Sequence, residues 1–480
     1  MTGEEATPSS VSEDNRSNLF LPSHLGELPI GGEAVTLYDG PMVLHHGKSQ
    51  IAGEGKVAFR LMPDLDVRFI MRSDEMLSGL VVSGDDDDPA VTKTLEMVST
   101  GRRTQVILTG ATVSSSPGQS SAHGKLVGNV QFAAEKPDGK PESIGRVRFH
   151  LVNLREFWGE RLQGPQPASG SKPWLGRTRF TFNQWIVTID ALPKIGERWE
   201  HLEARGGCAF THIGDLRRRD AELFASPEAA DVMGFLSLFL SFVNGACCGC
   251  VLAAGYRHLD CNLWEQWTPY IADTGKPGKN WFPAHLPDEG LTIAERAYAL
   301  WQDKGKREWL TLAIRLYTNS NTNTSGSEME LAQAQIALEL LCWVMLREEQ
   351  TILSEDGMEK LTAADRIRLL LSWSGIPLTI PSTLKKLTSA FAGVSGADGP
   401  SAVTEIRNRI VHPTKKNLAK LEEYDRLARF EAWQLTQWYV EMVMLKLFGY
   451  HGRYSNRLDF KFGAGAYEKV PWSAEANSPK

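Results

Sequence analysis

The chain has 480 residues, of which 42% are hydrophobic and 23% charged, as in an ordinary globular protein. This length predicts two or three domains, and the composition excludes a wholly disordered, collagenous or coiled-coil chain. Because 58 acidic residues outnumber 52 basic ones, the net charge is −6 and the average field repels phosphate, so any nucleic-acid binding requires a local basic patch. Six cysteines are too few for a disulfide scaffold and predict reduced thiols in a cytoplasmic protein.

The N-terminus is predicted to be a disordered tail over residues 1–25, because it is polar and acidic and lacks the features of a signal peptide. Residues 232–256 carry no charge and are long enough to span a bilayer. Gly234, Gly249 and the turn signal Asn244-Gly245 interrupt this run. We therefore expect a buried helix over 227–243, a turn and a buried strand over 247–254, with no membrane partner.

Residues 26–217 are predicted to form a β-rich N-terminal domain. Short runs of β-type residues with partial alternation are separated by turn signals, and no helix is expected between them. The clearest predicted strands are residues 57–61, 65–70, 105–108, 146–151, 177–182 and 185–189. Such a pattern indicates an antiparallel sandwich or barrel.

The rest of the chain is predicted to be mainly helical. Residues 218–288 form a mixed α/β closing segment and linker, residues 289–460 an all-α bundle, and residues 461–480 a tail. The predicted helices are residues 291–302, 307–317, 331–347, 363–373, 382–391, 402–411 and 418–448, the third preceded by a Ser327–Glu330 capping box. The fold class is therefore α+β multidomain, with the β-rich part first.

Four residues offer a weak zinc hypothesis: Cys247 and Cys250 form a C-x2-C pair, and His258 and Cys261 an H-x2-C pair. This ligand set suits tetrahedral zinc. The residues lie in or just after an apolar run, however, where cysteine behaves as a small hydrophobic residue. Core packing is the preferred interpretation, and no cofactor is expected.

The end of the predicted helix 402–411 is the candidate catalytic site. Val403, Ile406 and Ile410 form an apolar stripe that anchors the helix. Pro413 disfavours helical conformation at His412, which should therefore sit at the helix C-terminus, where the helix dipole favours a protonated imidazole.

Charge near this helix end suits phosphodiester chemistry. Histidine can act as general base or acid, and Arg407 can stabilise charge on a phosphorane. Arg409, Lys415, Lys416 and Lys420 are candidate RNA-binding residues, because no acidic residue lies between 407 and 420. Residues 291–480 carry a small positive balance, so the acidic excess belongs to residues 1–290.

The sequence Arg407-Asn408-x-x-x-His412, at the end of a helix in a helical C-terminal region, resembles the R-x4-H motif of the HEPN superfamily. The likeness covers about residues 291–458, and the segment 447–458 and the β-rich domain before the bundle resemble ApeA-like abortive-infection proteins. The resemblance implies a metal-independent endoribonuclease for antiviral defence, in which Arg407 and His412 are catalytic and Asn408 positions them. It also implies a homodimer or higher homo-oligomer with a composite cleft, an RNA substrate and a phage-derived trigger sensed by the N-terminal domain.

Two alternatives remain open at this point. HEPN bundles without activity exist, so the second hypothesis is a catalytically silent bundle that binds RNA, a nucleotide or a protein. A carboxylate from an earlier helix, Glu330 or Glu339, could assist the motif, but glutamates on a helix face are more often solvated or capping, so neither is counted in the site.

Overall fold

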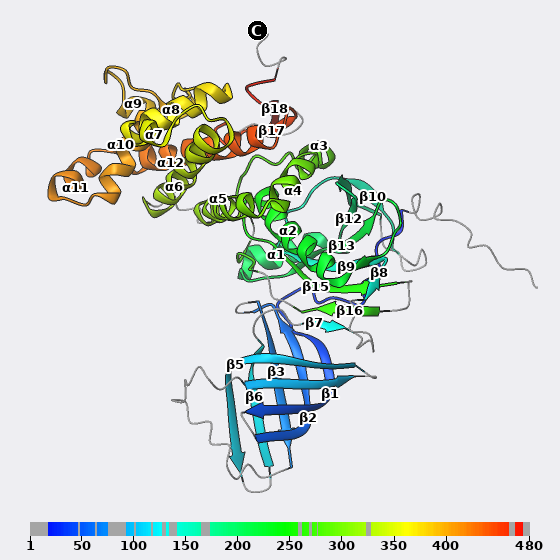
Figure 1. Cartoon of the computed structure of the whole chain (residues 1–480). Helices are drawn as coiled ribbons and strands as arrows, with labels where there is room; N and C mark the ends of the chain where they lie inside the picture. The colour runs from blue at the N-terminus through cyan, green and yellow to red at the C-terminus, as the bar shows by residue number, and fades with distance from the viewer. Residues whose placement is uncertain are drawn as a thin grey trace, which may run out of the picture.

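The computed structural model describes residues 18–46, 49–62, 65–74, 93–99, 102–116, 119–126, 131–133, 142–164, 173–257, 262–267, 271–275, 277–322, 328–459 and 466–473. It is built of a β-barrel, a broad antiparallel sheet and a helical unit, which follow one another across the molecule (Figure 1). An antiparallel β-rich N-terminal part thus precedes a helical C-terminal part. The predicted α+β multidomain fold class is confirmed.

A closed six-stranded barrel forms the first unit, in the strand order β1-β2-β3-β6-β5-β4. Its strands are β1 (Val35–His46), β2 (Ser49–Arg60), β3 (Asp66–Ser73), β4 (Lys93–Ser99), β5 (Arg102–Ser116) and β6 (Gln119–Leu126). Alternation along β3 buries Val67, Phe69 and Met71 and exposes Arg68, Ile70 and Arg72. Closure through the β1–β4 pairing satisfies both edges of what would otherwise be an open sheet.

An antiparallel eight-stranded sheet lies next to the barrel, in the order β10-β11-β12-β13-β9-β15-β16-β7. Its strands are β7 (Gln131–Ala133), β9 (Arg146–Val152), β10 (Glu160–Leu162), β11 (Trp174–Phe182), β12 (Trp185–Ala191), β13 (Phe210–Arg218), β15 (Gly249–Tyr256) and β16 (Asn262–Gln266), and β8 (Ser143–Ile144) pairs separately with β14 (Phe224–Ala225). One face, including Phe210 and Val251, shares the apolar core of the barrel. The other face packs against helices.

The structure departs from the predicted layout in three ways. Strands β15 and β16 come from the segment 218–288 and join the sheet beside β9, so this sheet continues past residue 217. A helix, α1 (Ile195–Arg205), interrupts the region in which only strands were expected, so that expectation is wrong. Residues 18–25, assigned to the tail, pair with Gln163 and hydrogen-bond to the sheet.

The uncharged segment forms helix α2 (Ser226–Asn244), as predicted, with Pro227 in its first turn and Gly245 at its C-cap with φ of 72°. By length and composition, α2 and residues 328–349 could each cross a membrane. In each, 67% of the apolar window is buried within the protein. Phe235 of α2 packs against Tyr298 with ring centroids 4.9 Å apart, as expected for a core helix.

The helical unit follows. Its helices are α3 (Pro287–Leu291), α4 (Ala294–Gln302), α5 (Lys304–Thr322), α6 (Glu328–Trp343), α7 (Glu355–Lys360), α8 (Ala363–Ser374), α9 (Lys385–Ala390), α10 (Gly399–Val411), α11 (Lys415–Glu422) and α12 (Arg426–Leu447). Helix α6 runs directly into a π-helix, η2 (Val344–Glu349). Ser327 of the predicted capping box lies outside the described residues, and α7 was not predicted.

The predicted single helix over 418–448 is wrong, because the chain forms α11 and α12 instead. Asp425 adopts a non-helical conformation, and its carboxylate accepts a hydrogen bond from the backbone nitrogen of Leu427 at 2.9 Å. This N-cap starts a new helix and changes the direction of the chain.

The C-terminal residues close the unit on the sheet side. Strand β17 (Arg453–Ser455) pairs with β18 (Tyr467–Lys469), and Arg457 forms a buried ion pair with Glu441 of α12. Arg155, from the loop after β9, donates hydrogen bonds to the carbonyl oxygens of Asn244 and Gly278 at 2.8 and 2.7 Å. Burial lowers the pKa of Arg155 to about 10.

Candidate active site

Helix α10 carries the predicted motif, and its start is fixed by a capping box. The carboxylate of Asp398 accepts from the backbone nitrogen of Ser401, whose hydroxyl accepts from the backbone nitrogen of Asp398, both at 2.9 Å. Arg368 of α8 also pairs with Asp398 at 2.6 Å. Val403 and Ile406 are fully buried, so the predicted apolar stripe does anchor this helix.

His412 ends α10, as the following proline predicts. It is the C-cap residue, with φ of −117° and ψ of 72°, and its backbone nitrogen still donates to the carbonyl oxygen of Asn408. Its own carbonyl oxygen accepts from the side-chain amide of Asn417 at 2.7 Å. The imidazole is exposed and makes no hydrogen bond to the described part of the chain, so it is available to a ligand.

Arg407 is half-buried and directed toward α6. Its guanidinium lies 3.3 Å from the carboxylate of Glu339 and donates to the side-chain oxygen of Asn408 at 3.2 Å. Its Nε atom is buried and has no hydrogen-bond partner. An unpaired buried donor beside an ion pair leaves part of this guanidinium unsatisfied.

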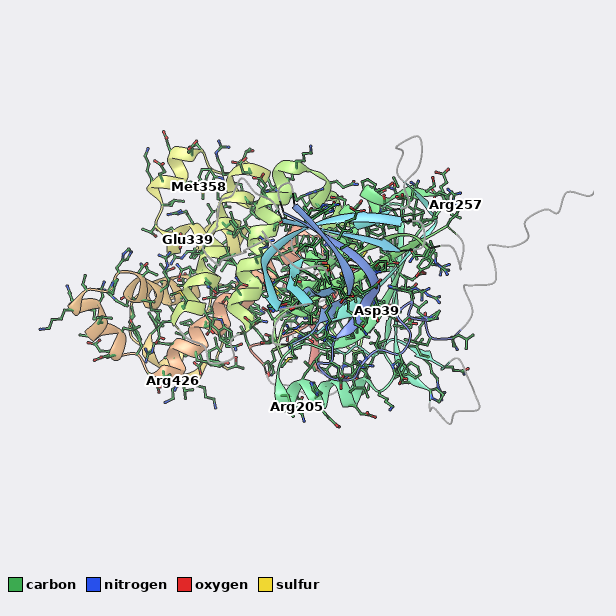
Figure 2. The ribbon with its side chains drawn as sticks, turned by 90° about the horizontal axis from the view of Figure 1, so that it is seen from below. Asp39, Arg205, Arg257, Glu339, Met358 and Arg426 are labelled. Atoms are coloured by element: carbon green, nitrogen blue, oxygen red, sulfur yellow. The ribbon has the colours of Figure 1, made fainter. Side chains whose placement is uncertain are left out.

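The sequence analysis left Glu339 out of the site, although a signal for it exists. It is the one charged residue between 331 and 346, in an otherwise apolar helix. A lone carboxylate there needs a partner, and Arg407 supplies it. Figure 2 labels Glu339 among the helices, far from Asp39 and Arg257 in the β-rich part.

A second arginine acts, like Glu339, on the Cys342 thiol of α6. Arg366 of α8 also has a buried Nε atom without a hydrogen-bond partner. Burial and the charge of Glu339 raise the pKa of the Cys342 thiol, and the charge of Arg366 opposes this rise. Arg366 and Glu339 therefore both act on the surroundings of Cys342, one helical turn beyond Glu339 on α6.

Within one chain, Arg407 is bonded to Glu339 and Asn408 and not to His412 in the described residues. Five residues of helix separate the backbone positions of Arg407 and His412 by roughly 140° around the axis. Asn408 contacts Arg407 through its side chain and His412 through its backbone.

The predicted RNA-binding residues divide into two kinds. The guanidinium of Arg409 bonds to Glu405 and, at 2.6 Å, to Asn417, so it joins α10 to α11. Lys415 and Lys416 are exposed, Lys420 is half-buried, and none of the three has an ion-pair partner in the described residues. Two lysines in the first turn of α11 oppose the helix dipole, so helix stability does not explain them.

The zinc hypothesis gains no support from the described half of its ligand set. Burial raises the pKa of the Cys247 thiol to about 11 and that of the Cys250 thiol to about 12, which disfavours the thiolates that zinc requires. His258 and Cys261 lie outside the described residues. Within the described ranges, no group of three His, Cys, Asp or Glu residues could hold a metal ion.

Comparison with known proteins gives matches over the sheet and the helical unit. The model of the YopA central domain matches residues 139–277, which include β8 to β16, and that of the YopA C-terminal domain matches residues 303–468. The SPbeta prophage-derived uncharacterized protein YopA of Bacillus subtilis (strain 168) is 26% identical over 467 residues, covering 96% of this chain and 100% of that protein. No solved structure matches. The chain is therefore similar to YopA proteins in its central and C-terminal parts, and to one of them along nearly its whole length.

Proposed function

We propose that this protein is a metal-independent endoribonuclease of the HEPN type, acting as an abortive-infection effector against phage. The observation that carries the proposal is the end of α10, where the exposed imidazole of His412 lies next to unpaired basic side chains and Arg407 is oriented by Glu339. These groups suit cleavage of RNA in which the 2′-hydroxyl of a ribose attacks the phosphate on the neighbouring 3′-oxygen. Such a reaction requires no external nucleophile.

The proposed reaction uses two proton transfers. A base, for which His412 is the candidate, takes the proton of the 2′-hydroxyl, whose oxygen attacks the adjacent phosphorus. The bond from phosphorus to the 5′-oxygen breaks, and that oxygen takes up a proton. The products are a 2′,3′-cyclic phosphate and a 5′-hydroxyl, and Arg407 stabilises the phosphorane between them.

The separation of Arg407 from His412 supports a site made by two copies of the chain. Val411 and Leu418, on either side of His412 in the sequence, are 36% and 47% exposed. Exposed apolar side chains beside a candidate catalytic residue are typical of an interaction surface. We propose a homodimer across this surface, in which the α10 ends of the two protomers form a composite cleft.

The β-rich part is proposed to sense a phage-derived trigger or to restrain the nuclease. We further propose a cytoplasmic location, where both RNA and a phage component are accessible. The similar Bacillus subtilis protein is described as prophage-derived, and a defence role is compatible with that origin.

A binding module without catalysis is the second candidate function. It is favoured by the same separation of Arg407 from His412, since a silent bundle needs no contact between them. The exposed Lys415 and Lys416 would then serve to hold RNA or a nucleotide, and the ion pair with Glu339 would be structural.

Cleavage of total RNA in EDTA distinguishes the two. Purified wild-type protein should cleave, whereas Arg407→Ala and His412→Ala should reduce the rate by 100-fold or more, on the order of the contribution of one general base or charge stabiliser. Arg426→Ala and His451→Ala, at exposed positions away from α10, are the matched controls and should cleave normally.

A nuclease that needs a trigger does not cleave RNA as purified protein alone. Its toxicity is therefore measured in cells that express the protein, with and without phage infection. Toxicity that appears only with infection and disappears with His412→Ala supports the enzyme. Equal behaviour of all variants in both assays contradicts it and favours the binding module.

A further inference from the structure

A second concave site lies at the far end of the α6–η2 helix. It has a volume of about 350 Å³ and is lined by η2, α8, α4 and the end of α12. Glu349 is ten residues beyond Glu339, or roughly 15 Å along the helix axis. The pocket is therefore separate from the candidate active site, although one continuous helix contributes to both.

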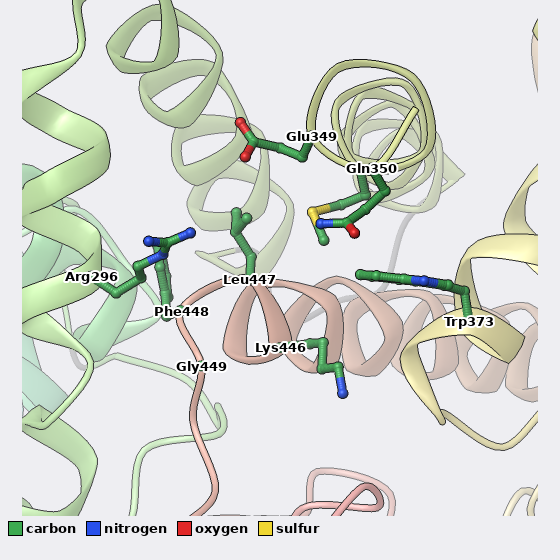
Figure 3. Close-up of a pocket in the computed structure, with 9 residues that line it drawn as sticks. Arg296, Glu349, Gln350, Trp373, Lys446, Leu447, Phe448 and Gly449 are labelled. Carbon is green, nitrogen blue, oxygen red and sulfur yellow. The ribbon is translucent and has the colours of Figure 1, made fainter. Parts of the chain in front are cut away.

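One side of the pocket presents an aromatic face. Trp373 of α8 is 38% exposed, and Figure 3 shows its ring extending into the pocket opposite Arg296, with Leu447 between them. An exposed tryptophan with no aromatic partner in the described residues is a platform on which a flat ring can stack. Proteins that bind single-stranded nucleic acid stack bases on such side chains.

The opposite side is positively charged. Arg296 of α4 is exposed and has no carboxylate partner in the described part of the chain, whereas the Nζ atom of Lys446 of α12 points away from Arg296 and lies 5.3 Å from the ring centroid of Trp472 (Figure 3). The carboxylate of Glu349 is already paired with Lys306 of α5, so it does not neutralise Arg296.

The end of α12 and the π-helix η2 form much of the pocket wall. The last carbonyl oxygens of α12 are occupied, because those of Met444, Leu445 and Lys446 accept from the backbone nitrogens of the three residues that follow the helix. The remaining wall is the π-helix η2, an element that is rare and often found at functional sites. Gln350, just after η2, offers both a donor and an acceptor to a base edge.

We propose that this pocket binds a nucleoside phosphate, with the base stacked on Trp373 and the phosphate held by Arg296. The volume is at the small end of the range for ligand pockets, which favours a mononucleotide over a polymer. The same chemistry could be presented by the phosphorylated end of an RNA strand. The inference is independent of catalysis by His412.

Calorimetric titration with AMP tests the site, with GMP, CMP and UMP in parallel. We expect one molecule per chain. Adenosine and ribose 5-phosphate should each bind at least about tenfold more weakly than AMP, because each lacks one of the two contacts. A dinucleotide with a 5′-phosphate distinguishes a free nucleotide from the end of an RNA strand. Binding of both AMP and the dinucleotide indicates that the site takes a free nucleotide. Binding of the dinucleotide alone indicates that it takes a strand end.

Variants connect the binding to this pocket. Arg296→Gln and Trp373→Ala should each weaken binding about tenfold or more, whereas Arg296→Lys and Trp373→Phe should retain most of it. Arg205→Gln and Trp158→Ala, at exposed positions in the β-rich part, are matched controls, and His412→Ala should bind like the wild type. No binding of any of these phosphates at millimolar concentration, or equal binding by all variants, would overturn the proposal.

Discussion

Removing the guanidinium of Arg457 should destabilise the helical unit more than any exposed ion-pair change. The Arg457 and Glu441 side chains are 1% and 0% exposed, and the guanidinium meets the carboxylate through contacts of 2.6 and 3.0 Å. Arg457→Met would leave a buried carboxylate with the hydroxyl of Tyr317, at 2.7 Å, as its remaining partner.

The magnitude follows from the burial of the charge that is left. Loss of one partner from a buried pair costs about 3–5 kcal/mol, whereas replacing both partners with apolar residues is often close to neutral. Arg457 also donates to the side-chain oxygen of Asn321 at 2.8 Å, which the double variant leaves unpaired. We therefore expect Arg457→Met to lower the free energy of unfolding by about 4 kcal/mol. The double variant Arg457→Met/Glu441→Leu should recover at least about 2 kcal/mol of that loss.

Urea denaturation followed by circular dichroism at the helix band measures both free energies of unfolding, and the double-mutant cycle gives their coupling. Lys386→Met is the matched control, because its ion pair with Asp425 is about half exposed on both sides and should contribute less than about 1 kcal/mol. If Arg457→Met lost no more than this control, or if the double variant were less stable than the single one, the inference that burial makes this pair important would be refuted.

Three further predictions concern pH, charge and metal. Burial lowers the pKa of His212 to about 3 and, with the charge of Arg148 as the smaller cause, that of His24 to about 4. Since the unfolded chain takes up these protons below about pH 6.5, each histidine should cost about 2 kcal/mol of stability between pH 7.5 and 5, and His212→Leu should remove its share of this loss in parallel urea titrations. Replacing Lys415 and Lys416 with Gln in a His412→Ala background should reduce the salt dependence of log K for single-stranded RNA by about 1.4, and an unchanged slope in fluorescence anisotropy would contradict a role in phosphate binding. Protein purified without added zinc should contain less than about 0.2 zinc per chain by elemental analysis, whereas stoichiometric zinc would revive the ligand set that includes Cys247.

Local sequence patterns predicted most elements of the fold. The end of the helix over 227–243 was predicted from the turn signal Asn244-Gly245, and α2 ends at Asn244 with Gly245 as its C-cap. Alternation predicted strands such as β3 and β12 within a few residues. These signals act between neighbouring residues, so a single sequence contains them.

Long-range pairing could not be predicted in the same way. The barrel closes because β1 pairs with β4, about 50 residues later, and β15 joins the sheet next to β9 across about 100 residues. No local pattern specifies these partners. The break between α11 and α12 was missed because the apolar spacing continues through it, and the cap formed by Asp425 decides the outcome.

The candidate site was predictable along the helix but not across helices. Pro413 placed His412 at the helix end, where the structure has it. The partners of Arg407 and Arg409 depend on packing, since Glu339 comes from α6 and Asn417 from α11. Arg409, which sequence reasoning grouped with the free lysines, is therefore occupied by contacts within the protein.

The chemical ends of cleaved RNA test the central claim most directly. Attack by the 2′-hydroxyl without a metal leaves a 2′,3′-cyclic phosphate on one fragment and a 5′-hydroxyl on the other, which mass spectrometry of a short oligonucleotide distinguishes from other ends. We predict these ends in EDTA with wild-type protein and their loss with His412→Ala or with a substrate carrying 2′-deoxyribose at the cleaved position. Fragments with 5′-phosphate and 3′-hydroxyl ends, or intact RNA with protein that is toxic in infected cells, would contradict the account.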